Sequence, residues 1–76
     1  MVAVFKKNEP VLYRTEDGKF WVGAIKEYRK SSVAGGDLLY TLSFPDGATL
    51  GSVPYGSLYA YDKSVAVERG SPPGAQ

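Results

Sequence analysis

Two aromatic residues and one carboxylate are the residues of this chain best suited to act together: Trp21, Phe44 and Asp46. Trp21 lies at the start of the second predicted strand, just after a Gly-containing turn. Phe44 and Asp46 lie at the end of the third strand and in the next turn, so a meander of strands should place all three at one end. Each aromatic ring face attracts a cation by roughly 0.5–2 kcal/mol, and a carboxylate adds Coulomb attraction and a hydrogen-bond acceptor. The set predicts a site for a cationic ligand.

The same three residues also have purely structural interpretations. Phe44 continues an alternating apolar pattern and Trp21 shares a face with Ile25, so both could be core residues. Asp46 precedes Gly47, and Asp is a common turn residue in that position. At the level of sequence, both interpretations stay open.

Several kinds of catalytic chemistry lack their usual residues here. The chain has no cysteine and no histidine, which removes thiolate ligands, disulfides, the usual general base and the usual zinc ligand. Nucleophile–base pairs would have to come from Ser, Tyr, Lys and carboxylates, and no spacing singles one out. We therefore expect a binding protein without a metal or cofactor rather than an enzyme.

The charge pattern argues against a nucleic-acid partner. The net charge is +1, and nucleic-acid modules usually carry a basic stripe. The basic residues of the N-terminal half are scattered: Lys6, Lys7, Arg14, Lys19, Lys26, Arg29 and Lys30. No stretch has the 18 or so apolar residues of a membrane-spanning helix, and Met1–Phe5 is too short for a signal-peptide core. We expect a soluble, intracellular protein.

Short apolar runs between turn residues predict an all-β fold. Aromatic residues make up 13% of the 76 residues, and Gly, Pro, Asp and Ser separate the runs, as in domains of short strands. The predicted strands are 11–15, 20–28, 38–44, 48–53 and 58–61, with one helical turn over 54–57. Gly23 lies inside the second strand, where glycine often marks a bend or a close backbone approach.

The chain is predicted to form one domain with two loose ends. Residues 1–8 are expected to be an N-terminal arm or an extra strand, and residues 9–63 the folded domain. Residues 64–76 are expected to be a flexible tail, because their last part is rich in Gly, Pro and Ser. Residues 29–37 are predicted to be a long loop.

Three stretches of the sequence resemble the Tudor family. Residues 11–25 resemble its opening hairpin, residues 40–47 its third strand with a Phe-x-Asp-Gly turn, and residues 53–58 its closing segment with a helical turn. The resemblance covers about residues 9–61. It implies a five-stranded, SH3-like barrel of Tudor type with a single helical turn before the last strand.

The resemblance also implies a ligand and a site. Many Tudor domains bind methylated lysine or arginine in an aromatic cage, and Trp21, Phe44 and Asp46 fall on cage positions with suitable side chains. Thr15 and Ala48 fall on positions where the family usually has aromatic residues, which leaves half a cage. Tyr13 falls on a position that usually points into the barrel. The implied partner is a peptide or protein, such as a methylated histone tail. If the chain is a eukaryotic Tudor module, the resemblance implies a location on chromatin in the nucleus; if it is not, the expected location is the cytoplasm.

Two other functions remain as alternatives. Residues 21–25 with Gly51-Ser52-Val53 and Tyr55 are also similar to the type II dihydrofolate reductases, tetrameric barrels of SH3-like fold. Their pore motif is Val-Gln-Ile-Tyr, and Val53-Pro54-Tyr55 lacks its Gln and Ile. The second alternative is an oligomerisation or protein-interaction barrel, because Tyr55, Tyr59 and Tyr61 cluster in sequence and tyrosine is favoured at interfaces.

Overall fold

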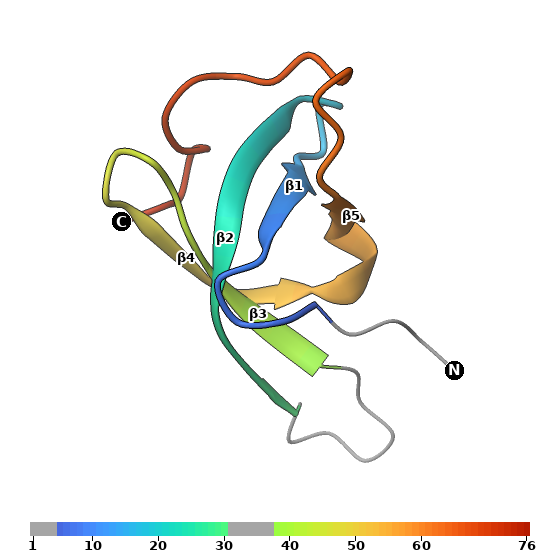
Figure 1. The fold of residues 1–76 in the computed structure, drawn as a ribbon. Helices are drawn as coiled ribbons and strands as arrows, with labels where there is room; N and C mark the ends of the chain where they lie inside the picture. Colours follow the sequence, from blue (N-terminus) through green and yellow to red (C-terminus); the bar gives the residue numbers. More distant parts are fainter. Residues whose placement is uncertain (1–4, 31–37) are drawn as a thin grey trace.

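The computed structural model describes residues 5–30 and 38–76 and shows one sheet of five antiparallel strands (Figure 1). Every predicted strand is present, with its ends within two residues of the prediction. The elements are β1 (Pro10–Arg14), β2 (Phe20–Lys30), β3 (Leu38–Ser43), β4 (Thr49–Pro54), the 3-10 turn η1 (Tyr55–Ser57) and β5 (Leu58–Ala60). The all-β prediction and the helical turn before the last strand are confirmed.

The strand order is β4-β3-β2-β1-β5, so the last strand returns to lie beside the first. β2 is long enough to serve two neighbours: its first half pairs with β1 and its second half, from Ala24, pairs with β3. A register shift between Ile25 and Glu27 lies near this change of partner. Such irregularities bend a strand and increase its twist, which lets one face of the sheet curve around a core.

The core lies on one face of this curved sheet. The alternation predicted for the third strand is confirmed, since Tyr40 and Leu42 are fully buried and Phe44 is 5% exposed. The core cluster consists of Phe5, Val11, Ile25, Tyr40, Leu42, Phe44, Val53 and Leu58. Trp21 and Tyr13 are half-buried and pack against it.

Leu12 is buried on the opposite face, outside the core cluster. It is 2% exposed and lies directly between its cross-strand partners Val22 and Tyr59. The rings of Phe20 and Tyr59 meet edge to face with centroids 5.7 Å apart. A small second apolar cluster therefore covers the outside of β1, β2 and β5.

Gly23 marks a close approach, as predicted for a glycine inside a strand. A Cβ atom at this position would meet the Phe44 ring at 3.0 Å and the Ser43 carbonyl oxygen at 3.1 Å. Both distances are shorter than ordinary contacts, so only glycine lets β2 pass this closely to the end of β3.

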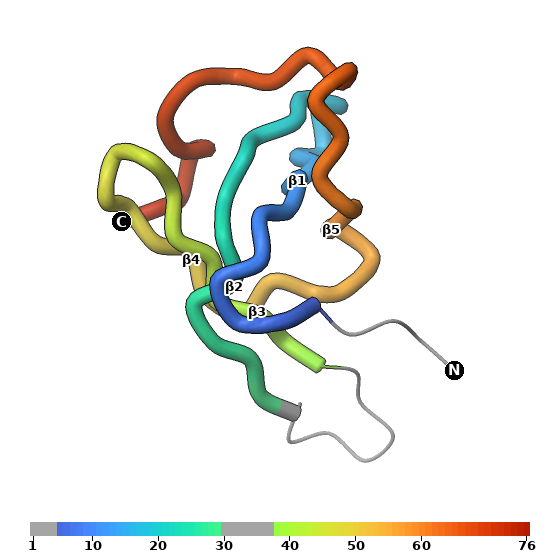
Figure 2. Tube along the Cα trace, viewed as in Figure 1, coloured from blue at the N-terminus to red at the C-terminus, as the bar shows by residue number. Residues whose placement is uncertain are grey.

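The chain beyond β5 turns back across the sheet instead of leaving it (Figures 1 and 2). The backbone of Gln76 and that of Thr49 in β4 exchange two hydrogen bonds, of 2.6 and 2.8 Å. Pro72 is buried, and Ala75 packs against the core cluster. Paired backbone bonds and apolar contacts hold the segment in this placement, and the flexibility expected for residues 64–76 stays a prediction.

The other end contributes Phe5, which is 8% exposed and lies in the core beside Tyr40 and Tyr55. The rest of the predicted N-terminal arm, residues 1–4, lies outside the described residues, as do residues 31–37 of the predicted loop. The first residues assigned to that loop, Arg29 and Lys30, belong to β2. Among the residues described, no helix combines the length and apolarity needed to cross a membrane.

Candidate functional site

The turn between β1 and β2, residues 15–19, is built by its own side chains and one glycine. The Thr15 N–H donates to the Lys19 carbonyl oxygen at 2.9 Å, and the Gly18 N–H donates to the Thr15 carbonyl oxygen at 2.9 Å. Gly18 has a φ of +84°, a conformation that suits glycine. The Thr15 hydroxyl also donates to the Asp17 carboxylate. The turn therefore holds the two strands in register.

That register places Tyr13 directly opposite Trp21 on the same face of the sheet. Residues in such a pair have Cβ atoms about 4.5–5.5 Å apart, so the two aromatic side chains are neighbours. Both are half-buried, with one part against the core and another part lining a cavity of about 690 Å³. We call this the Tyr13–Trp21 cavity.

Charged residues of the turn form one side of the Tyr13–Trp21 cavity: Glu16, Asp17 and Lys19. The hydrogen bond from the Thr15 hydroxyl lowers the pKa of Asp17, with smaller contributions from Lys19. Asp17 therefore stays ionised at neutral pH. The cavity combines aromatic surface with carboxylates at its rim.

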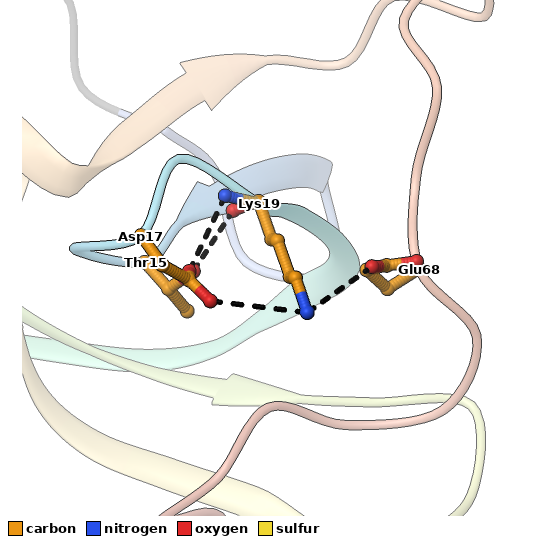
Figure 3. A network of polar contacts seen from close by, with 4 residues as sticks. All are labelled: Thr15, Asp17, Lys19 and Glu68. Atoms are coloured by element: carbon orange, nitrogen blue, oxygen red, sulfur yellow. Dashed lines mark hydrogen bonds and ion pairs between the residues drawn. The ribbon is translucent and has the colours of Figure 1, made fainter.

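Residues Ser71, Pro72 and Pro73 line the other side of the cavity. Figure 3 shows how the turn meets the chain beyond β5: the Lys19 ammonium lies 3.9 Å from Asp17 and 3.8 Å from Glu68. All these side chains are well exposed. The ion pairs lie where the turn contacts the chain beyond β5, and Ser71, Pro72 and Pro73 contribute to the lining of the cavity.

The residues predicted from the sequence separate in the structure. Trp21 and Thr15 both line the Tyr13–Trp21 cavity. Phe44 lies in the core, and the small part that is exposed lines a different hollow, beside Gly23. Asp46 and Ala48 lie in the β3–β4 turn and do not line the cavity.

Asp46 is engaged in holding two segments together. One carboxylate oxygen accepts the Ala48 N–H at 3.0 Å, and the other accepts the Ser71 hydroxyl at 2.7 Å. These two bonds, the one from Ala48 first, lower the pKa of Asp46. It contacts the cavity wall through Ser71 rather than facing a ligand directly.

Sequence reasoning missed several residues of the cavity. Tyr13 was expected to point into the interior; it does pack against the core, but it also lines the cavity. The register of the Asp-Gly hairpin contains the signal that could have found it, because Tyr13 and Trp21 are equally distant from the turn. Nothing in the sequence indicated Ser71 and its neighbours, since their contacts cross most of the chain.

Two further placements bear on the alternatives. Val53 is buried and Tyr55 packs on the Phe5 ring with centroids 5.6 Å apart, so both side chains of the segment similar to the reductase pore motif contact the core. Tyr59 and Tyr61 are 45% and 48% exposed. Across residues 5–30 and 38–76, no group of three or more carboxylates could hold a metal ion.

Comparisons of the chain with protein-family models, with curated proteins and with solved structures find no match.

Proposed function

We propose that this chain is a non-catalytic binding module that holds a cationic side chain of a peptide partner in the Tyr13–Trp21 cavity. The observation that carries the proposal is the pairing of two aromatic side chains around one open cavity whose charged lining, Glu16, Asp17 and Lys19, has a net negative charge. Aromatic faces attract cations. Carboxylates at the rim favour a positively charged ligand and orient it by accepting its hydrogen bonds.

The topology supports an SH3-like barrel of Tudor type as the framework. The last strand lies beside the first, and a 3-10 turn precedes it, in agreement with the fold that the resemblance implies. The proposed cage differs from the one implied by the resemblance: Tyr13 takes the place of Phe44, and Glu16 and Asp17 take the place of Asp46.

Methylated lysine or arginine is the side chain that fits this environment best. Methyl groups add apolar surface and weaken the hydration of the cation, so less free energy is lost when aromatic rings replace water. Two ring faces together give at most about 4 kcal/mol. We therefore expect a dissociation constant no lower than about 1 mM for a single side chain.

The test is an NMR titration of the full chain with a short peptide carrying trimethyllysine, next to the same peptide with unmodified lysine. We expect selective shifts at Trp21 and Tyr13, with tighter binding of the methylated peptide. Trp21→Leu should abolish these shifts while the remaining amide spectrum stays folded.

Because Trp21 also packs against the core, a second variant leaves the core untouched. Glu16→Gln removes one rim charge, and we expect about a two- to fivefold loss of affinity. Glu27→Gln is the matched control, since it is the same change at an exposed position outside the cavity. Equal affinity for both peptides, or equal effects of the two Gln variants, would contradict the proposal.

Self-association is the second candidate, and the exposed tyrosines favour it. Tyr28, Tyr59 and Tyr61 are each between 45% and 49% exposed. Tyrosine is enriched at interfaces because it supplies apolar area together with a hydroxyl. The mass of the chain in solution at increasing concentration tests this candidate: a mass that rises to that of a dimer supports self-association, and a constant monomer mass contradicts it.

A further inference from the structure

The last nine residues, 68–76, follow one surface of the molecule from end to end; we call them the C-terminal segment. At its start, the Glu68 N–H donates to the Phe20 carbonyl oxygen at 2.8 Å, beside Trp21. At its end, Gln76 and Thr49 exchange two backbone hydrogen bonds. The segment thus adds a parallel bridge to β2 and a reciprocal pair of backbone hydrogen bonds to β4, an edge strand.

Between these ends the segment makes side-chain contacts. The Ser71 hydroxyl donates to Asp46 at 2.7 Å. Pro72 is buried, and Ala75 packs against the core cluster. Gly70 and Gly74 turn the chain with φ angles of +82° and +93°. The segment is therefore held by backbone hydrogen bonds at both ends and, between them, by the Ser71–Asp46 hydrogen bond and the apolar contacts of Pro72 and Ala75.

These are the contacts that a separate peptide makes when it adds to a sheet. Edge strands offer unpaired N–H and C=O groups, and peptides bind them through the backbone while pockets select side chains. The segment connects to β5 only through residues 61–67, of which all but Val65 are exposed. The connection between β5 and the segment is therefore an exposed stretch with a turn held by Asp62 and Ser64.

We propose that the surface holding residues 68–76 is a peptide-binding site, and that its outside partner is an extended segment with a hydroxyl residue followed by proline. The chain's own Ser71-Pro72 is the tethered occupant of this site. The partner pairs with the backbone of Phe20 and Thr49, donates its hydroxyl to Asp46 and buries its proline where Pro72 lies. This inference does not depend on a cationic ligand in the Tyr13–Trp21 cavity.

A tethered occupant competes strongly because its effective concentration is in the millimolar range. An outside peptide therefore binds weakly to the unmodified chain. It binds more tightly when the docking of residues 68–76 is destabilised. Ser71, Pro72 and Pro73 also line the Tyr13–Trp21 cavity, so exchange of the segment rebuilds one side of that cavity with the partner's residues.

The variant that weakens the occupant is the full chain with Gly70→Ala and Gly74→Ala. Alanine disfavours a positive φ, so the docked segment is destabilised without a change to any residue that it contacts. We expect the undocked fraction to rise at least about tenfold. Gly56→Ala is the matched control, because a Cβ there meets nothing within 4 Å and no positive φ is involved.

Two measurements report undocking without any ligand. Amide hydrogen exchange of Glu68, Thr49 and Gln76 should accelerate in the double variant. Acrylamide quenching of Trp21, the one tryptophan in the chain, should increase, because Trp21 lies beside the segment. Gly56→Ala should leave both unchanged.

The binding test adds a synthetic peptide with the wild-type sequence of residues 66–76. We expect it to bind the double variant at least about tenfold more tightly than the unmodified chain or Gly56→Ala, with shifts at Trp21 and Thr49. A peptide in which serine at the position of Ser71 is replaced by alanine should bind more weakly.

Three outcomes would overturn the inference. The first is unchanged hydrogen exchange and quenching in the double variant, together with no binding of the peptide. The second is undocking without binding, which would make the segment a fixed part of the fold. The third is a dimer of the unmodified chain with exchanged segments, which would assign the surface to a second copy. Failure of trimethyllysine binding would refute only the proposed function, since none of these measurements uses that ligand.

Discussion

The Asp46 carboxylate joins two parts of the chain that are 25 residues apart. One oxygen accepts the Ala48 N–H within the β3–β4 turn, and the other accepts the Ser71 hydroxyl of the C-terminal segment. Both bonds favour the ionised form, which is why the pKa of Asp46 lies below its ordinary value. We therefore expect the docking of the C-terminal segment to depend on pH through this one exposed side chain.

The sign of that dependence follows from the lowered pKa. A group whose pKa is lower in the folded state stabilises that state above its unfolded pKa, about 4. This contribution is lost as the pH falls through the folded value. Acid should therefore weaken the bonds between Asp46, the turn and Ser71.

Asp46→Asn tests this at the residue scale. We expect the variant to unfold at a lower denaturant concentration than the unmodified chain at pH 7, with the difference shrinking as the pH falls below about 4 through the lowered pKa of Asp46. The pKa values of Asp17 and Asp62 are also lowered by hydrogen bonds, but those groups are common to both proteins and cancel in the difference. Parallel stability–pH curves would show that the charge of Asp46 contributes nothing.

At the scale of the elements, the structure depends on how β2 passes the end of β3. The first half of β2 pairs with β1 and the second half pairs with β3. At Gly23 the strand passes the Phe44 ring so closely that a methyl group would overlap it. A rigid aromatic side chain in the core, next to backbone, can yield only a little.

Gly23→Ala should therefore destabilise the fold by about 1–3 kcal/mol through overpacking. For a domain of this length that corresponds to a fall in the melting temperature of roughly 5–20 °C. Gly51→Ala is the control within β4, since its Cβ would make only an ordinary contact with the Thr41 hydroxyl at 3.7 Å. Thermal unfolding of both variants, followed by circular dichroism, checks the prediction, and equal melting temperatures would contradict it.

The ion pairs between elements contribute little by comparison. Lys19 lies between Asp17 on the turn and Glu68 at the start of the C-terminal segment (Figure 3). Its side chain is 56% exposed, and such surface pairs are typically worth about 0–1 kcal/mol. Backbone pairing, the Asp46–Ser71 bond and the buried Pro72 are what hold the segment to the sheet.

At the scale of the whole molecule, both ends of the described chain complete one small core. A domain of this length buries only about 60% of the surface that its unfolded chain exposes, so each apolar contact matters. Phe5 enters the core from one end and Ala75 covers it from the other. The five strands alone do not enclose the core.

Phe5→Ala should cost about 3–5 kcal/mol, a large part of the stability of such a domain. The variant is expected to be partly unfolded at 37 °C, whereas Phe5→Leu should remain folded because it leaves a smaller cavity. Val67→Ala serves as the exposed control, with an expected change within about 0.5 kcal/mol. Urea unfolding measures all three, and a small effect of Phe5→Ala would show that residue 5 is dispensable to the core.

Local pattern was sufficient to predict the strands and the inner face of the sheet. Alternation placed Tyr40, Leu42 and Phe44 on one face because a strand has a period of two. The strand ends could be predicted from the turn residues, because Asp-Gly pairs favour tight turns. Of the predicted site residues, Trp21 and Thr15 line the Tyr13–Trp21 cavity, whereas Phe44, Asp46 and Ala48 lie outside it.

The sequence by itself determined the strands, their turns and the 3-10 turn, since these depend on neighbouring residues. It also determined that histidine and cysteine chemistry is absent. Only the tertiary structure decided that Tyr13 joins Trp21 at a cavity, that Asp46 bonds to Ser71, and that residues 68–76 lie on the sheet. Those contacts join residues that are far apart in the chain or that meet only after folding, and the local pattern of apolar and polar residues does not determine which distant segments come into contact.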